Sequence, residues 1–176
     1  MDRYFNDVAK VINNSPIKDL SKLCEIIKKV KESGSKIIIA GNGGSAAISS
    51  HLAVDFTKAS KVRAINFNEA DLITCFANDY GYDNWIKEAL IAYCDPSDLV
   101  ILISSSGRSP NMLEAAKWAN QEKITLVTAT GFDKENPLRS LGEINIWVDS
   151  NSYNVVEMAH HIWLLGVVEQ IAADAL

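Results

Sequence analysis

The chain has 176 residues, of which 48% are hydrophobic and 22% charged, and its formal net charge is −5. A domain of about 150 residues buries roughly 70% of the surface of its unfolded chain, so this length suits one domain with a sizeable core and leaves no room for a second. The composition excludes a disordered or fibrous chain, and because no block of five or more Lys and Arg residues occurs, we expect no direct binding to nucleic acid.

The hydrophobic pattern alternates between helices and short strands. Two helices are predicted first, at about 2–13 and 17–33, and the others at about 45–59, 69–77, 83–93, 110–121 and 153–175. Between them lie β-branched runs, several of them apolar on both faces, which is typical of a parallel sheet covered by helices on both sides. These predicted strands are Lys36–Ala40, Val62–Asn66, Asp98–Ile103, Lys123–Ala129 and Glu143–Val148.

We therefore predict an α/β fold with a single doubly wound, five-stranded parallel sheet. One domain, 1–176, comprises leading helices (1–34), an α/β core (35–150) and a closing helix (151–176). The closing helix carries apolar residues nearly all the way round, and such a helix needs burial on several sides that a monomer of this size does not supply. The pattern therefore predicts a homo-oligomer.

Cysteine usage and the N-terminus bear on the compartment. Cys24, Cys75 and Cys94 lie in apolar contexts without C-x-x-C spacing, so we expect buried free thiols rather than disulfides or a thiolate metal site. The N-terminus lacks a basic segment followed by an apolar run, and no stretch approaches the roughly 18 apolar residues of a membrane span. A cytoplasmic location without a membrane partner is the resulting expectation.

The loop after the first predicted strand, Gly41–Ser45, is rich in glycine and opens a helix. Glycines let the backbone approach a ligand closely, and the N–H groups at a helix N-terminus favour an anion such as phosphate. The same spacing also satisfies the dinucleotide fingerprint G-x-G-x-x-G/A, and a turn that serves packing alone is a third interpretation.

The loop after the third predicted strand reads Ser104-Ser105-Ser106-Gly107-Arg108-Ser109-Pro110 and also precedes a helix. Four hydroxyls and several turn N–H groups supply many neutral donors to phosphate oxygens. A flexible Ser/Gly linker would not stand between a buried strand and a helix of one domain. Because parallel strands end at one edge of the sheet, both loops are expected at the edge where open α/β folds bind ligands.

A phosphorylated sugar explains both loops better than a nucleotide does. A dinucleotide enzyme would leave the serine loop unused, and Asn66 and Asn68 stand where it needs an acidic residue. A phosphate-binding P-loop is excluded because no G-K-[ST] follows the glycines. We therefore predict a sugar phosphate ligand and no nucleotide cofactor.

Further motifs accompany the two loops in a fixed order. The series is Gly41–Ala47, His51-x-x-x-Asp55, Ala77–Gly81, Ser104–Asn111 and Glu157-x-x-His160. In order and approximate spacing it resembles the phosphoheptose isomerases, a branch of the sugar isomerase (SIS) family, over nearly the whole chain. The resemblance implies a SIS fold, usually a homotetramer. It also implies conversion of sedoheptulose 7-phosphate to D-glycero-D-manno-heptose 7-phosphate for cell-surface polysaccharide.

The resemblance also implies which residues hold the substrate. It places phosphate on the serine loop and the sugar near the glycine loop, and it adds an aspartate and a histidine as candidates. The full set of implied substrate residues is Asn42, Gly43, Ser45, Asp79, Ser104, Ser105, Ser106, Ser109 and His160. For Asp79, capping of the next helix or shaping of its turn stays an alternative.

Acid/base chemistry is expected on two helices. By this resemblance Asp55 stands at the position of the family's acid/base glutamate, and Glu157 at the position of a glutamine. The family also has a second acid/base histidine, which is a zinc ligand. In this chain that position is Leu165. His161 offers a substitute because it lies four residues after Glu157, on the same helix face, and His51 and Asp55 form the same kind of pair. Only one of the adjacent His160 and His161 can face inward.

If these two helix faces meet, two imidazoles and two carboxylates converge, a ligand set that suits Zn²⁺. The predicted catalytic residues are Asp55, Glu157 and His161, and the predicted metal ligands are His51, Asp55, Glu157 and His161. The predicted function is that of a phosphosugar aldose–ketose isomerase.

Two alternatives stay open. Leu165 favours a catalytically altered SIS protein that acts as a sugar-phosphate sensor or a scaffold, like the replication-initiator-associating proteins, which this chain resembles in the same loops. A nucleotide-dependent oxidoreductase is the weaker alternative, based on the glycine loop alone.

Overall fold

The computed structural model describes residues 1–174. Its centre is a five-stranded sheet in the order β2-β1-β3-β4-β5, in which every neighbouring pair is parallel. The strands are β1 (Lys36–Gly41), β2 (Arg63–Asn66), β3 (Leu99–Ser104), β4 (Thr125–Thr130) and β5 (Ile144–Trp147). The chain moves outward from β1 to β2 and then returns to the other side of β1, so the strand order reverses between β1 and β3. Ligands of open α/β sheets bind at such a reversal.

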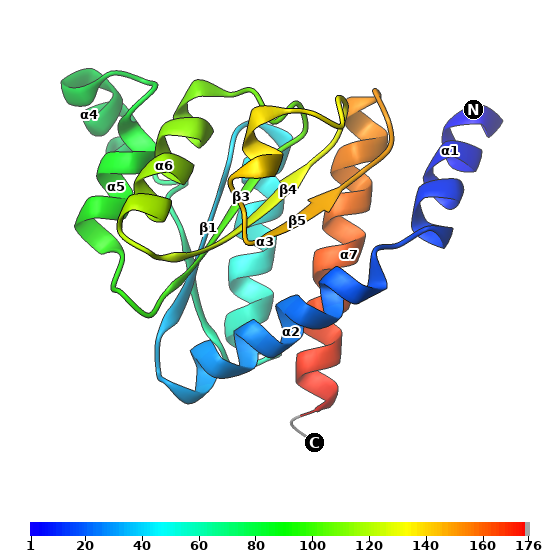
Figure 1. Cartoon of the computed structure of the whole chain (residues 1–176), viewed down its shortest axis with the longest axis horizontal. Coiled ribbons are helices and arrows are strands. Elements are labelled where there is room, and N and C mark those ends of the chain that lie inside the picture. Colours follow the sequence, from blue (N-terminus) through cyan, green and yellow to red (C-terminus); the bar gives the residue numbers. More distant parts are fainter. Residues whose placement is uncertain (175–176) are drawn as a thin grey trace.

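Helices cover both faces of the sheet (Figure 1). On one face pack α2 (Ile17–Glu32), α3 (Gly44–Lys58) and α7 (Tyr153–Ala173), and on the other pack α5 (Trp85–Tyr93), α6 (Pro110–Gln121) and the 3₁₀ helix η1 (Pro137–Ser140). The predicted doubly wound α/β fold is confirmed.

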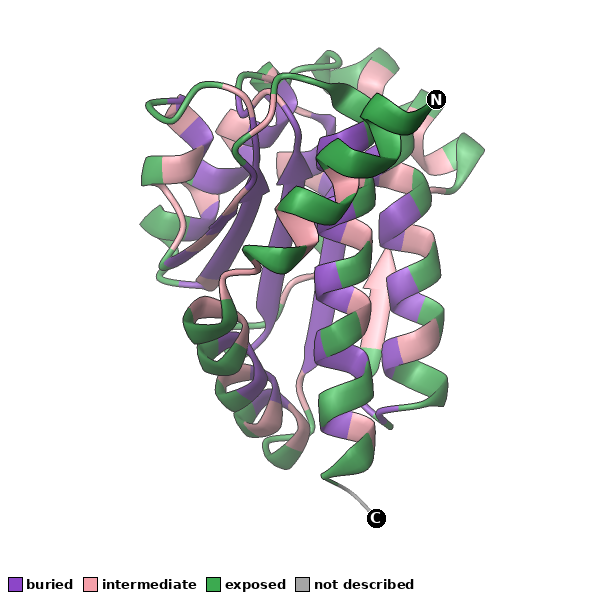
Figure 2. Cartoon of the chain, turned by 90° about the vertical axis from the view of Figure 1, so that its right-hand side faces the viewer, coloured by how far each residue is buried: buried purple, intermediate pink, exposed green. Residues whose placement is uncertain are grey.

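The core consists of two layers, one on each face of the sheet. Along β1, Ile37 and Ile39 face the α2, α3 and α7 layer, whereas Ile38 faces the α5 and α6 layer. All six residues of β1 and all six of β3 are buried, as expected for central parallel strands. Figure 2 shows these buried strands behind helices whose outer faces are exposed.

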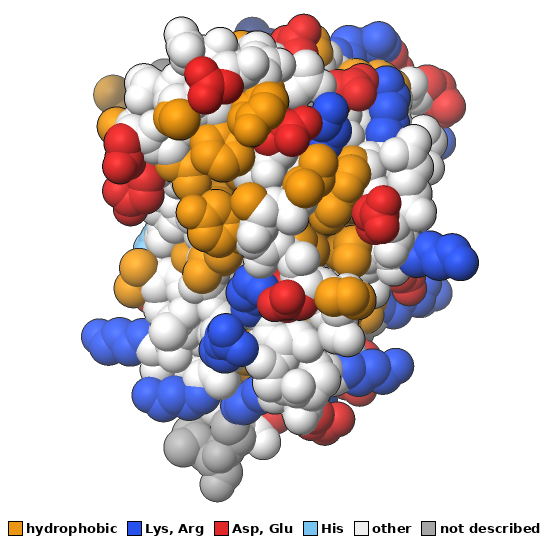
Figure 3. All heavy atoms as spheres, turned by 90° about the vertical axis from the view of Figure 1, so that its left-hand side faces the viewer, with side chains coloured by type: hydrophobic (Ala, Val, Ile, Leu, Met, Phe, Trp, Pro, Cys, Tyr) orange, Lys and Arg blue, Asp and Glu red, His pale blue; other side chains and the backbone are white. Residues whose placement is uncertain are grey.

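Two helices lie at the periphery and bury no residue. The first, α1 (Asp2–Asn13), extends away from the sheet and packs on α7. The second, α4 (Ala70–Tyr80), borders α5. Exposed apolar and aromatic side chains lie on α4 and α5, among them Tyr80, Ile91 and Tyr93. Figure 3, which views the molecule from the α4 and α5 side, shows hydrophobic patches on that face.

At the edge of the sheet opposite the two loops, an ionic cluster joins β1 to the segment before β3. Lys36 Nζ lies 2.6 Å from Asp98 Oδ2 and 2.7 Å from Asp95 Oδ2. Asp98, only 1% exposed, also accepts hydrogen bonds from the backbone N–H groups of Lys36 and Asp95. The buried carboxylate therefore has several donors and a paired cation.

The helix and strand boundaries either coincide with the predicted ones or differ by at most three residues. The largest difference is in α4, which continues to Tyr80 and ends at Gly81, where φ is +80°. The three cysteines are free, but only Cys24 is buried; the expectation of burial is wrong for Cys75, because it lies on exposed α4. The predicted closing segment extends to residue 176, and residues 175 and 176 lie outside the described part. Among residues 1–174, no helix is long and apolar enough to cross a membrane.

Candidate functional site

A cavity of about 290 Å³ lies at the reversal of strand order, where the loops after β1 and β3 meet the start of α7. The two loops are adjacent because β1 and β3 are hydrogen-bonded neighbours whose register pairs Gly41 with Ile103. The lining residues are Asn42, Gly43, Gly44, Ser45, Ile103, Ser104, Ser105, Ser106, Ser109, Tyr153 and Glu157. Every predicted substrate residue except Asp79 and His160 is among them.

The glycine loop brings the start of α3 to the cavity. Gly43 has φ +56° and ψ −120°, a conformation that favours glycine, and it directly precedes the first residue of α3. At Gly41 a Cβ would overlap the backbone and Cβ of Ser45, so a side chain is excluded there. The N-terminus of α3 therefore faces the cavity with its positive dipole end, which favours an anion.

The serine loop presents hydroxyls to the same cavity. Ser104 and Ser105 are buried, and the hydroxyls of Ser104 and Ser109 lie 3.3 Å apart. Within residues 1–174 the buried Ser105 hydroxyl has no hydrogen-bond partner. A buried hydroxyl without a partner is costly, and a phosphate oxygen in the cavity would supply one. The loop has the chemistry of an anion site.

The segment between β4 and η1, residues 131–136, packs against the serine loop together with the start of η1. Gly107, with φ +61°, packs against the buried side chain of Asn136, where any Cβ would overlap the amide. Leu138 N donates to Gly107 O, Gly131 N donates to Ser105 O, and Arg108 pairs with Asp133 at 2.6 Å. The supporting role of Asn136 could not be predicted from the sequence, because a single polar residue in a turn is common and does not indicate burial.

A second amide, Asn111, joins the serine loop to the glycine loop. Asn42 Nδ2 donates to Asn111 Oδ1 at 3.0 Å, and Asn111 Nδ2 donates back to Asn42 Oδ1 at 2.9 Å. The hydroxyl of Tyr82 donates to the same Asn42 oxygen at 3.3 Å. Asn111 ends the motif Ser104–Asn111, but the motif alone does not predict this contact with Asn42.

Glu157 provides the single charged side chain among the lining residues. Its carboxylate lies directly over Gly44, where a Cβ would overlap it, at the N-terminal end of α3. Within the described chain Glu157 has neither an ion pair nor a side-chain hydrogen bond. A carboxylate is therefore available to a ligand beside the serine loop.

Three of the predicted catalytic or metal residues meet between α3 and α7, away from the cavity lining. His51 Nδ1 lies 2.8 Å from His161 Nε2, and His51 Nε2 lies 3.1 Å from Asp55 Oδ2. Burial, together with the neighbouring His51, lowers the pKa of His161. The two helix faces meet as expected, but Glu157 lies one helical turn from His161 and reaches the cavity instead.

These residues do not fit a zinc ion as they stand in one chain. Zn²⁺ usually takes four ligands in a tetrahedral arrangement. The two imidazoles turn nitrogen atoms toward each other, but Asp55 contacts the opposite nitrogen of His51. Among residues 1–174, no group of three or more His, Cys, Asp or Glu side chains is arranged to hold a metal ion. The predicted metal set stays a prediction.

The remaining candidates lie outside the cavity lining. His160 is fully buried, with Nε2 3.0 Å from Thr130 O, and burial lowers its pKa to about 4, so the ring is neutral. His160 thus faces the core while its neighbour His161 faces α3. Asp79 is exposed on α4, where its carboxylate accepts a hydrogen bond from the Asn78 amide. Leu165 packs against the core layer.

Known proteins match most of this chain in sequence. A family model described as SIS domain matches residues 3–131. The phosphoheptose isomerase of Aliarcobacter butzleri is 32% identical over 159 residues, which cover 87% of this chain and 83% of that protein.

Solved structures share the fold. The phosphoheptose isomerase of Neisseria gonorrhoeae matches with a TM-score of 0.84 at 23% identity, over 96% of this chain and 92% of that one. That of Francisella tularensis matches with a TM-score of 0.86 at 20% identity, over 98% and 94%. The Vibrio vulnificus NanR protein, solved in complex with ManNAc-6P, has a TM-score of 0.73 at 16% identity, over 98% of this chain and 62% of that one.

Proposed function

The chain belongs to the SIS-domain family of phosphoheptose isomerases, and on that premise we propose that it is a phosphosugar aldose–ketose isomerase. The proposed reaction converts sedoheptulose 7-phosphate to D-glycero-D-manno-heptose 7-phosphate. The observation that carries the proposal is the cavity in which the serine loop, the N-terminus of α3 and the carboxylate of Glu157 face one space. An anion site and an acid/base group therefore stand side by side.

The serine loop would hold the phosphate and the α3 side would face the sugar. Serine hydroxyls and helix N-terminal N–H groups donate to phosphate oxygens without a fixed cation. This assignment is supported by the four serines of the serine loop that line the cavity and by the unpartnered Ser105 hydroxyl. The sugar phosphate bound by the similarly folded NanR is consistent with this ligand class.

Isomerisation moves one proton between two neighbouring carbons and needs no oxidant or reductant. A base takes a proton from C1 of the ketose, an enediol forms, and the proton returns to C2 while a hydroxyl proton passes between the two oxygens. Glu157 is the predicted catalytic residue that lines the cavity, so we assign the carbon-to-carbon transfer to it. Asp55 and His161 contact His51 from either side but lie outside the cavity lining, so we assign them no step in this transfer.

A Zn²⁺ ion stays in the proposal as a component that experiment must test. Its predicted ligands are His51, Asp55, Glu157 and His161, and its chemistry would be polarisation of the sugar carbonyl. Because the described side chains do not complete a site in one chain, we assign no step to it.

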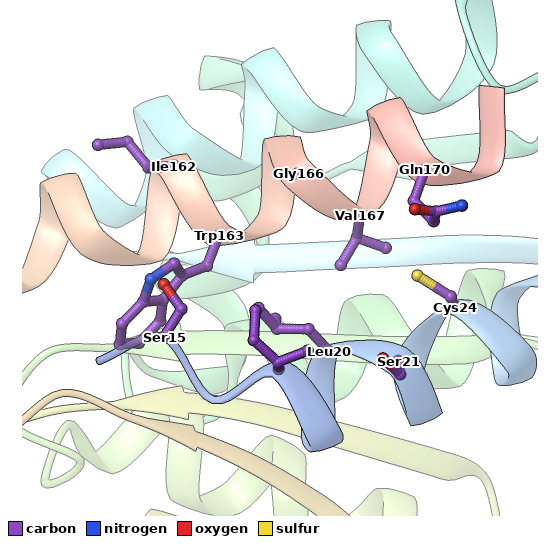
Figure 4. Close-up of a pocket in the computed structure, with 10 residues that line it drawn as sticks. Ser15, Leu20, Ser21, Cys24, Ile162, Trp163, Gly166, Val167 and Gln170 are labelled. Atoms are coloured by element: carbon purple, nitrogen blue, oxygen red, sulfur yellow. The ribbon is translucent and has the colours of Figure 1, made fainter. Parts of the chain in front are cut away.

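We also propose that a second copy of the chain covers the groove between α2 and α7. The groove, shown in Figure 4, has a volume of about 280 Å³ and lies apart from the loop cavity. Exposed Ile162 borders it, and α1, which buries nothing in one chain, stands nearby. Sedimentation equilibrium should give a homo-oligomer, for which the family resemblance favours a tetramer.

Turnover of sedoheptulose 7-phosphate tests the proposal. Wild-type protein, assayed with and without Zn²⁺, should form the aldose, and Glu157→Gln should lower kcat by about 10² to 10⁴ because it removes the proton carrier. Ser106→Ala should mainly raise KM. Glu169→Gln makes the same change on the exposed side of α7 and should leave both constants unchanged. No turnover by the wild-type protein under either condition would remove the proposal.

One observation favours a second candidate, a non-catalytic sugar-phosphate sensor or scaffold. Leu165, at the position of the family's acid/base histidine, packs against the core and offers no proton carrier. This candidate predicts binding of sugar phosphate without turnover. The same assay, combined with a binding titration, separates it from the isomerase.

A further inference from the structure

The pair formed by Asn42 and Asn111 uses nearly all the hydrogen-bonding capacity of the Asn42 amide. A side-chain amide has two N–H donors and two oxygen lone pairs. The Asn42 oxygen accepts from Asn111 Nδ2 and from the Tyr82 hydroxyl, and one Asn42 N–H donates to Asn111. What remains for the cavity is a single N–H donor.

Asn111 is anchored more firmly than its partner. It is 1% exposed, lies in the first turn of α6, and its oxygen also accepts a hydrogen bond from Met112 N at 3.1 Å. Asn42, by contrast, is half-buried and lines the cavity. The orientation of the Asn42 amide therefore follows from Asn111, and the glycine loop is joined at this point to the start of α6.

We propose that Asn111 is a positioning residue that fixes Asn42 as a hydrogen-bond donor to the sugar. The inference rests on the proposed function and deepens it. Asn42 then offers an N–H to a carbonyl or hydroxyl oxygen, whereas Glu157 offers only acceptor oxygens when ionised. The cavity thus selects a sugar that presents an oxygen acceptor on the Asn42 side and a hydroxyl donor on the Glu157 side.

Two ligands separate the role of Asn111 from a general structural role. Inorganic phosphate lacks the sugar oxygens that would accept from Asn42, whereas sedoheptulose 7-phosphate presents them. Asn111→Leu, which is close to isosteric but cannot hydrogen-bond, should lower affinity for the sugar phosphate about fivefold to tenfold. Affinity for inorganic phosphate should change less than twofold. Isothermal titration calorimetry on the full chain measures both.

A double-mutant cycle tests whether Asn111 acts through Asn42. In an Asn42→Ala background, Asn111→Leu should cause no further loss of sugar phosphate affinity, because the oriented amide is already gone. Asn111→Ser, which keeps a hydroxyl for Met112 N, provides a second variant if the leucine variant does not fold. Asn120→Leu, on the same helix where the Asn120 amide donates to Leu141 O, is the matched control and should leave both affinities unchanged.

The outcomes separate this inference from the proposed function. Equal losses for both ligands, or additive losses in the double mutant, would overturn the role of Asn111 and leave the phosphosugar site intact. A wild-type protein that binds neither ligand would overturn both proposals.

Discussion

Replacement of Gly107 by alanine tests whether the serine loop is held in shape by the buried Asn136 behind it. Gly107 has φ +61°, a conformation that costs an alanine about 1 to 2 kcal/mol. The new Cβ would also overlap the Asn136 amide, which accepts from Arg139 N and donates to Asp133 O and Gly131 O. Displacing this amide weakens hydrogen bonds worth about 1 kcal/mol each. Together these effects should lower the free energy of unfolding by about 2 to 4 kcal/mol.

Gly34→Ala provides the matched control. Gly34 has φ +71°, but its Cβ would meet nothing within 4 Å, so only the conformational cost of about 1 to 2 kcal/mol applies. Urea denaturation of both variants measures the difference, and phosphate titration measures loop function, which only Gly107→Ala should impair. If Gly107→Ala were no more destabilising than Gly34→Ala and bound phosphate normally, the assigned support by Asn136 would be wrong.

Two further predictions concern the opposite edge of the sheet. Asp98→Asn should destabilise the protein by about 2 to 3 kcal/mol in urea denaturation, because a buried acceptor of backbone and Lys36 hydrogen bonds loses its charge. Asp95→Asn, on the exposed partner of Lys36, should cost clearly less; equal costs would contradict the importance of the buried carboxylate. For cysteine reactivity, burial and the nearby Asp98 raise the pKa of Cys94 to about 12, so at pH 8 its thiolate is scarce. Iodoacetamide followed by mass spectrometry should therefore modify exposed Cys75 well before Cys94, and the reverse order would contradict this environment.

The sheet could be predicted from the sequence because its signals are local. Runs such as Ile37–Ile39 are apolar at every position, as a strand covered on both faces requires, and they are too short for a buried helix. Pro110 and Pro137 stand at the start of helices, where proline is favoured. The meeting of the two loops also followed, because parallel strands end at one edge of the sheet.

The contacts within the site could not be predicted in the same way. Asn42 and Asn111 are 69 residues apart, and their pairing depends on the β1–β3 register and on the orientation of two amides. Helical spacing placed Glu157 and His161 on one face, but which of them reaches the cavity depends on where along α7 the cavity lies, and it lies beside Tyr153 and Glu157. The exposure of Cys75 likewise depends on the peripheral position of α4, which an apolar local context does not reveal.

A crystal structure of the protein soaked with sedoheptulose 7-phosphate would show whether the serine loop holds the phosphate. We expect the phosphate within hydrogen-bond distance of the hydroxyls of Ser104, Ser105, Ser106 and Ser109, with the sugar extending toward Asn42 and Glu157. Phosphate bound elsewhere, with the loop cavity left to solvent at saturating ligand, would contradict it.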